Sequence, residues 1–193
     1  MARPGSELVT VFGGSGFVGA QTVRSLARQG WRVRVAVRNP HLAVHLKPQG
    51  DVGQIQLMAC DVSDDAQVAA ALEGASAAIN LVGILFETTG RRFQALHAQA
   101  PARIARACAD RGITRFVQVS AIGADATSES RYARTKAEGE AGARGALPST
   151  VVIRPSVIFG RGDDFLNRFA FMASFAPALP LPGGGETLFQ PVY

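Results

Sequence analysis

The sequence predicts an α/β protein with a Rossmann-type, doubly wound parallel sheet. Three observations support this prediction: short β-branched runs alternate with Ala-rich stretches, six such runs occur before Pro155, and a glycine-rich turn follows the first. The 193 residues suffice for one domain with a buried core, and 47% of them are apolar. No apolar run is long enough to form a membrane-spanning helix.

The alternation predicts six strands and four helices. The expected strands are Leu8–Phe12, Arg32–Val37, Gln54–Met58, Ala77–Val82, Arg115–Val119 and Thr150–Ile153. The expected helices are Phe17–Gln29, Asp64–Leu72, Phe93–Arg111 and Arg131–Arg144. Two glycines, Gly139 and Gly142, weaken the second half of the last helix, because glycine is a poor helix former.

The composition changes after Pro155, first to Phe-rich and then to Pro- and Gly-rich sequence. We expect a Rossmann domain over residues 1–160 and the start of an incomplete C-terminal substrate or docking lobe over residues 161–193. Leu188–Tyr193 has the pattern of a beginning strand, so we expect that the chain is truncated there.

Within the second part, we interpret Asp164–Pro182 as a docking or pocket-lining segment. If it is helical, one face carries Phe165, Phe169 and Met172, and another side carries Phe171 and Phe175. The first alternative is packing against a C-terminal lobe. The second is a surface for a partner or a membrane, because exposed aromatic patches commonly mark such sites.

Charge and cysteine usage argue against several classes of function. Of the 20 basic residues 18 are Arg, and they are spread along the chain, so the net charge of +5 does not indicate a nucleic-acid partner. Cys60 and Cys108 lack metal-ligand spacing, so we expect two buried thiols and no metal site. The N-terminus lacks the apolar stretch of a secretory signal, which predicts a cytoplasmic protein.

Glycines follow the first strand with the spacing GxxGxxG, at Gly13, Gly16 and Gly19. They permit a tight turn, the approach of a pyrophosphate to the backbone and close helix packing, while the helix N-terminus favours the phosphates. The motif is specific because it stands between a strand and a helix. We therefore predict that these glycines bind a dinucleotide together with Ser15 and Phe17.

The end of the second strand is expected to select the cofactor. An NAD-specific site places an Asp or Glu here for the ribose hydroxyl, whereas this chain has Val37, Arg38 and Asn39. A guanidinium binds a 2′-phosphate through paired, charge-assisted hydrogen bonds. Arg38 therefore predicts NADP(H), with NAD(H) less favoured, and the alternative is a solvated strand-end arginine.

Two further strand ends supply predicted cofactor contacts. Asp61 and Val62 follow the third strand, where such folds place the adenine. The fourth strand ends in Leu81, Val82 and Gly83, which we also assign to the cofactor. The alternative for Asp61 is to cap the helix that begins near Asp64.

Tyr132 and Lys136 have the spacing YxxxK, which places both side chains on one face of a helix. Ser120 ends the preceding strand, at the edge of the sheet where ligands bind. In such a constellation the phenol exchanges a proton with a substrate, the ammonium lowers the pKa of the phenol, and the serine orients the substrate oxygen. The alternative is an exposed tyrosine beside a solvated lysine.

Together these residues resemble the short-chain dehydrogenase/reductase superfamily, in its extended or atypical branch. The stretches VFGGSGFVG, INLVG, SRYARTKAEGE, RPSVIFGRGDDFLNRFA and FQPVY are similar to the NADPH-binding accessory subunits of respiratory complex I and to bacterial relatives labelled NAD-dependent epimerase/dehydratase. The resemblance implies that Arg38 binds the 2′-phosphate, that Lys136 contacts the nicotinamide ribose, and that Pro155 and Val157 border the nicotinamide.

The resemblance leaves two functions open. The first is a binding subunit that holds NADPH and docks onto complex I, peripheral on the inner face of the membrane. The second is an epimerase, dehydratase or reductase that acts on a nucleotide sugar or a quinone precursor, with Ser120, Tyr132 and Lys136 as catalytic residues. One departure puts the proton relay in doubt: extended enzymes carry an Asn where this chain has His97, which we expect on the helix surface.

Overall fold

The computed structural model describes residues 7–176, 186, 188 and 190–193, without the side chains of residues 164–166 and 168. The chain divides into two compact units, Met1–Arg154 and Pro155–Tyr193. The first unit carries the sheet. The functional boundary expected after residue 160 stays a prediction.

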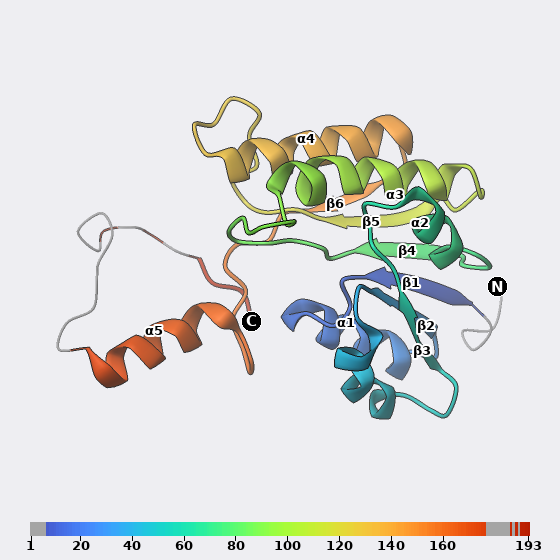
Figure 1. Ribbon diagram of the computed structural model, residues 1–193, viewed down its shortest axis with the longest axis horizontal. Helices are drawn as coiled ribbons and strands as arrows, with labels where there is room; N and C mark the ends of the chain where they lie inside the picture. The colour runs from blue at the N-terminus through green and yellow to red at the C-terminus, as the bar shows by residue number, and fades with distance from the viewer. Residues whose placement is uncertain (1–6, 177–185, 187, 189) are drawn as a thin grey trace. The chain divides into compact units, whose positions relative to one another are not determined.

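The sheet confirms the predicted fold class. Its six strands stand in the order β3-β2-β1-β4-β5-β6, and each neighbouring pair is parallel (Figure 1). The strands are β1 Leu8–Phe12, β2 Arg32–Val37, β3 Ile55–Ala59, β4 Ala77–Asn80, β5 Arg115–Val119 and β6 Val151–Ile153. The strand order reverses between β1 and β4, which is the point where ligands bind in open α/β sheets.

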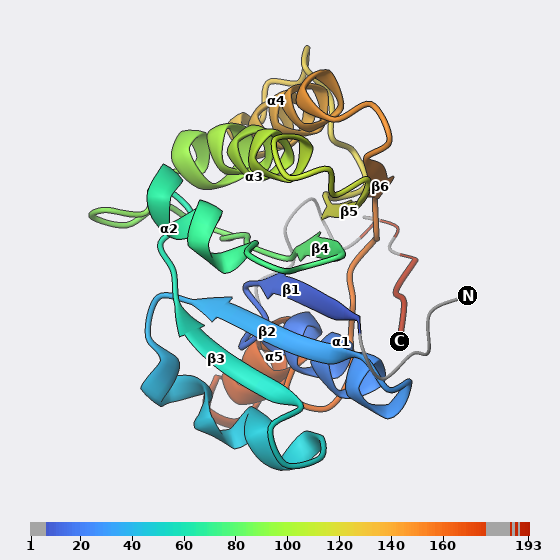
Figure 2. The same ribbon diagram turned by 90° about the vertical axis from the view of Figure 1, so that its right-hand side faces the viewer.

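Helices cover both faces of this sheet, as a parallel sheet requires (Figures 1 and 2). One face carries α1 Phe17–Arg28 and η2 Pro40–Gln49, and the other carries α2 Asp65–Ala71, η3 Gln94–Gln99, α3 Ala100–Ala109 and α4 Arg131–Ala146. Valines of β1, β2 and α1 form the core on the first face, with Val11, Val23 and Val35 fully buried. The core on the second face includes the buried side chains of Phe12 and Phe116.

Three strands differ from their predicted bounds, because polar side chains at their ends form hydrogen bonds with backbone groups. β3 starts one residue later than predicted, since Gln54 Nε2 donates to backbone carbonyls on either side of the turn between α1 and β2. β4 is shorter, since Asn80 Oδ1 accepts the amide of Val82 (3.1 Å) and turns the backbone. β6 starts after Thr150, whose hydroxyl donates to the carbonyl of Leu147 (2.6 Å).

The helix η2, which links β2 to β3, is absent from the predicted elements. The side chain of Asn39 caps this 3-10 helix by accepting the amide of His41 (3.2 Å), and Pro40 occupies its first position. A capping Asn followed by Pro is a recognised start signal for a helix. That signal could have found η2.

The second unit contains α5, Asp164–Phe175, which confirms that the predicted segment Asp164–Pro182 is helical over these residues. Residues 177–182 of that segment lie outside the described residues. Phe171 and Phe175 are exposed to 67% and 79%, and their ring centres lie 5.2 Å apart. The expected strand Leu188–Tyr193 is wrong for the described residues, where Val192 forms a single bridge with Ile158. No described helix is both long and apolar enough to span a membrane.

Candidate functional site

The first glycine turn lies against the segment that follows β4. Gly13 has a φ of +76°, which favours glycine, and its amide donates to the carbonyl of Ala36 on β2 (3.1 Å). A Cβ at this position would lie 3.0 Å from the amide nitrogen of Val82 and 3.1 Å from the carbonyl carbon of Leu81. The turn therefore closes on the end of β4 at the switch point of the sheet.

The N-terminus of α1 packs directly on this turn. A Cβ on Gly19 would lie 2.6 Å from the Cα of Gly14, so only glycine permits the approach. The cap residue Gly16 offers no side chain to the first amides of α1, and the first turn carries no acid. Free amides at a helix N-terminus bind phosphate, so the cradle fits the pyrophosphate of a dinucleotide. Ser15 is exposed beside it, and Phe17 is half-buried.

Arg38 is exposed directly after β2, the neighbour of β1. In the described part of the chain its guanidinium has no hydrogen-bond or ion-pair partner. The next residue, Asn39, is occupied as the cap of η2. The strand end thus presents a cation and no acid.

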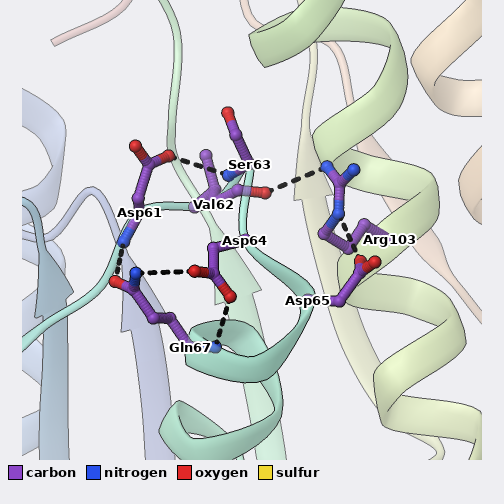
Figure 3. A network of polar contacts seen from close by, with 7 residues as sticks. All are labelled: Asp61, Val62, Ser63, Asp64, Asp65, Gln67 and Arg103. Carbon is purple, nitrogen blue, oxygen red and sulfur yellow. Dashed lines mark hydrogen bonds and ion pairs between the residues drawn. The ribbon is translucent and has the colours of Figure 1, made fainter.

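The loop after β3 is held by a polar network (Figure 3). The carboxylate of Asp61 accepts the amide of Ser63 (2.8 Å), and the amide of Asp61 donates to Oε1 of Gln67 (2.9 Å). Asp64 is the cap of α2, since its Oδ1 accepts the amide of Gln67 (3.0 Å). The alternative that Asp61 caps this helix is therefore wrong, and its side chain stays exposed.

Val62 differs from Asp61, although both were assigned to the adenine. Its side chain is 5% exposed and belongs to the core, and its carbonyl accepts a hydrogen bond from Nη1 of Arg103 (3.1 Å; Figure 3). Arg103 is fixed in turn by an ion pair with Asp65. Of the two predicted residues, only Asp61 presents its side chain at the surface.

The segment after β4 is tied to the helices behind it. Leu81 and Val82 are half-buried, and Gly83 is exposed. The amide of Ile84 donates to Nε2 of His97 (3.0 Å). The predicted contact residues thus lie between the glycine turn on one side and a histidine of η3 on the other.

Tyr132 and Lys136 lie one turn apart on α4, with Nζ of Lys136 5.8 Å from the centre of the Tyr132 ring. Lys136 is only 6% exposed, which excludes the alternative of a solvated lysine. Burial lowers the pKa of Lys136 to about 8, although the charge of Glu140 opposes this. Burial raises the pKa of Tyr132 above its ordinary value, so the expectation that the ammonium lowers it is wrong.

A buried carboxylate lies one turn beyond Lys136. Glu140 is 3% exposed, and both its oxygens accept hydrogen bonds from the guanidinium of Arg154 (2.6 to 3.1 Å). Burial would raise the pKa of Glu140, but the hydrogen bonds from Arg154 hold it below its ordinary value. Ser120 is 5% exposed after β5, and among the described residues its buried hydroxyl has no hydrogen-bond partner.

The expectation that His97 lies on the helix surface is wrong, because the side chain is 2% exposed. A Cβ on Gly139 would overlap the carbonyl oxygen of His97, and a Cβ on Gly142 would lie 2.9 Å from Cβ of Ala102. The two glycines therefore let α4 pack against η3 and α3. The spacing of the two glycines is a sequence signal for this contact, although glycine also weakens a helix.

The remaining predicted residues are two cysteines and two residues of the second unit. Cys60 and Cys108 are buried thiols, as expected, and burial raises their pKa values to about 11 and about 12. Pro155 and Val157 belong to the second unit, where the carbonyl of Val157 accepts the amide of Val192 (2.9 Å). Their contact with the nicotinamide stays a prediction.

Comparison with known proteins identifies two kinds of relative. The chain is 38% identical over 188 residues to the mouse protein named NADH dehydrogenase [ubiquinone] 1 alpha subcomplex subunit 9, mitochondrial, with 96% of this chain and 50% of that protein covered. It is 33% identical over 184 residues to the ceramide reductase of Caulobacter vibrioides, with 94% and 56% covered. The chain thus spans about half the length of these relatives.

The fold is shared with the Bordetella bronchiseptica enzyme WbmG in complex with NAD. The TM-score is 0.72 at 15% identity, with 90% of this chain and 62% of that one covered. The family model described as NAD(P)H-binding matches residues 13–145, which include the glycine turn, the end of β2, Tyr132 and Lys136. The chain therefore belongs to the NAD(P)H-binding family.

Proposed function

We propose that this chain holds NADP(H) at the carboxyl edge of its sheet, as the cofactor-binding domain of a protein that assembles with respiratory complex I. The uncapped N-terminus of α1 receives the pyrophosphate, with Gly13, Gly16 and Gly19 giving it room. Asp61 lies at the adenine side, and Tyr132 and Lys136 lie at the nicotinamide end.

One observation carries the choice of NADP(H) over NAD(H): the strand end that contacts the ribose has Arg38 and no acid. We expect Arg38→Ala to weaken NADPH binding by roughly 10- to 100-fold, because a charge-assisted hydrogen bond is lost. NADH binding should stay unchanged. Arg32→Ala is the matched control, since Arg32 is exposed at the opposite end of the same strand. Fluorescence titration that gave equal NADPH affinities for Arg38→Ala and wild type would exclude the assignment.

The assembly with complex I is supported by the 38% identity to a subunit of NADH dehydrogenase [ubiquinone]. Exposed aromatic surface on α5, at Phe171 and Phe175, provides a face for a partner at the inner side of the membrane. We expect the double change Phe171→Ser and Phe175→Ser in the full-length protein to abolish co-purification with complex I or membranes at an unchanged melting temperature.

The control for this experiment is Leu42→Ser, because Leu42 is 75% exposed on η2. That variant should keep both stability and association. If the two phenylalanines instead pack in a core, their loss should lower the free energy of unfolding by about 3 kcal/mol or more. Retained association together with a fallen melting temperature would contradict the docking role.

A second function, an epimerase, dehydratase or reductase, is favoured by the buried pair of Tyr132 and Lys136. A bound nicotinamide would supply or accept a hydride. Tyr132 is protonated at neutral pH, because burial raises its pKa, so its hydroxyl is able to give a proton to a substrate oxygen. Ser120 would orient that oxygen.

A reductase and a holding domain separate in one experiment on the full-length protein, because only a reductase consumes reduced cofactor in its net reaction. Protein purified with reduced cofactor is mixed with nucleotide sugars, quinone precursors and ketones, and its absorbance at the nicotinamide band is followed. A holding domain keeps its cofactor reduced with every substrate. Oxidation by one substrate that is lost in Tyr132→Phe, at unchanged cofactor affinity, would establish the enzyme.

A further inference from the structure

His97 joins three elements of the candidate nicotinamide end. It belongs to η3, a π-helical turn that continues into α3, and π-helical turns occur often at functional sites. α4 packs on its backbone through Gly139. The segment after β4 is bound to its ring through the amide of Ile84. One residue of η3 thus contacts α4 through its backbone and the segment after β4 through its ring.

The imidazole is enclosed by aromatic rings. Phe93 is stacked on it, with ring centres 5.0 Å apart and an angle of 20° between the planes. The ring of Tyr132 meets it edge-on, with centres 5.2 Å apart and an angle of 88°. These contacts leave the ring little freedom to move away from the Ile84 amide. They also place it directly beside the tyrosine assigned to the site.

The hydrogen bond requires a neutral imidazole with a free lone pair on Nε2. Burial and the charge of Lys136 lower the pKa of His97 to about 3, so the ring stays neutral over the physiological range. Its proton therefore resides on Nδ1. The Lys136 ammonium is near, since the position of a Cβ on Gly83 lies 3.5 Å from Nζ of Lys136 and 3.9 Å from Nε2 of His97.

We propose that His97 is a positioning residue: by accepting the Ile84 amide it holds the segment Leu81–Gly83 against Tyr132 and Lys136, and so sets the affinity for the nicotinamide half of the cofactor. This inference rests on the proposed cofactor binding. Loss of the acceptor would leave a buried amide without a partner, and unsatisfied buried donors are strongly unfavourable. The segment would then move to find another acceptor, away from its place between Gly13 and η3.

Two variants separate the acceptor from the ring. His97→Gln keeps an acceptor, because Oε1 of glutamine stands as many bonds from Cα as Nε2 of histidine. His97→Phe keeps an aromatic ring for Phe93 and Tyr132 and removes the acceptor. In the full-length protein we expect His97→Phe to weaken NADPH binding by about 10-fold or more, and His97→Gln to bind within about threefold of wild type.

The adenine-side fragment is the second probe. Adenosine 2′,5′-bisphosphate lacks the nicotinamide half, so its affinity should be equal in wild type, His97→Gln and His97→Phe. NADH and its adenine-side fragment AMP are titrated in parallel. These titrations detect the case in which wild type prefers NADH to NADPH. Equal weakening of dinucleotide and fragment would show a merely structural role and overturn the proposal. So would unchanged dinucleotide binding in His97→Phe, or a loss in His97→Gln as large as in His97→Phe.

Amide hydrogen exchange tests the contact without cofactor. The Ile84 amide should exchange slowly in wild type and His97→Gln, and faster in His97→Phe. If His97→Phe does not fold, the proposal is tested by the NMR resonances of the His97 ring nitrogens in wild type. At neutral pH, Nε2 must show the chemical shift of an unprotonated acceptor. A protonated Nε2 overturns the proposal. If wild type binds neither dinucleotide, the proposed function fails, while exchange at Ile84 still tests the role of His97 in holding the segment.

Discussion

Replacing Lys136 with Met should make this protein more stable while it weakens cofactor binding. Lys136 is 6% exposed, and in the described part of the chain its ammonium has no carboxylate within ion-pair distance. A buried charge without a close partner is unfavourable, because desolvation is not compensated. Methionine fills a similar volume with an apolar, adaptable side chain. The change therefore removes the charge and keeps the packing.

The magnitude follows from the pKa of Lys136, which is lowered from 10.5 to about 8. At about 1.4 kcal/mol for each pKa unit, the buried charge destabilises the folded state by roughly 3 kcal/mol at neutral pH. This destabilisation is fully present below pH 8, where folded and unfolded chains are both protonated. It is relieved as the pH rises from about 8 towards 10.5, because the folded state then loses its proton first.

Urea denaturation at pH 7 and pH 9 measures this effect. The contribution of Lys136 should make wild type more stable at pH 9 than at pH 7 by about 1.3 kcal/mol, and Lys136→Met should lack this contribution. The difference between the two proteins is the quantity to compare. Folding raises the pKa values of Cys60 and Cys108 from 9.0 to about 11 and about 12, so both proteins lose stability as the pH rises through about 9. The reasoning would be refuted if Lys136→Met were less stable than wild type at pH 7 and if the difference in free energy of unfolding between the two proteins were the same at pH 9.

Three further experiments test the contact of α4, the cofactor site and the cysteines. Gly139→Ala should lower the free energy of unfolding by about 2 kcal/mol or more, because its Cβ would overlap the carbonyl of His97. Gly145→Ala should raise the free energy of unfolding by up to about 1 kcal/mol, because a Cβ at Gly145 has nothing within 4 Å. Urea denaturation compares the two variants. Lys136→Ala should weaken NADPH binding in a titration, while Tyr132→Phe, which keeps the ring, should bind NADPH like wild type. Cys60 and Cys108 should resist a thiol reagent at pH 8 until urea unfolds the chain, since both are buried; rapid labelling of native protein would contradict this.

The sheet could be predicted because each strand has a local sequence pattern. The run Leu8–Phe12 is apolar or β-branched throughout and is buried at every position, as a central parallel strand must be. Gly13 could be assigned from its place after that strand, and the structure gives it the left-handed backbone that the motif needs. The ends of β3, β4 and β6 were less predictable, because each depends on one side chain that bonds to a distant or adjacent backbone group.

The surroundings of Lys136 and His97 could not be read from periodicity. Whether His97 faces solvent depends on how closely α4 approaches η3, and two glycines on α4 decide that distance. A helical pattern alone treats Gly139 and Gly142 as defects, since it contains no information about the neighbouring helix. The rise in the pKa of Tyr132 likewise results from burial by tertiary packing.

The burial of Lys136 and His97 bears on whether the protein holds its cofactor or turns it over. In the proposed site a neutral His97 and an ammonium at Lys136 would serve a bound cofactor in either case, so their presence does not favour chemistry. Tyr132 is different, because its hydroxyl is needed only for proton transfer, whereas its ring alone packs against His97 and Phe93. A domain that only holds the cofactor would therefore lose nothing measurable in Tyr132→Phe, while His97→Phe would still weaken the cofactor. The comparison of these two variants in one titration identifies which atoms of the site are in use.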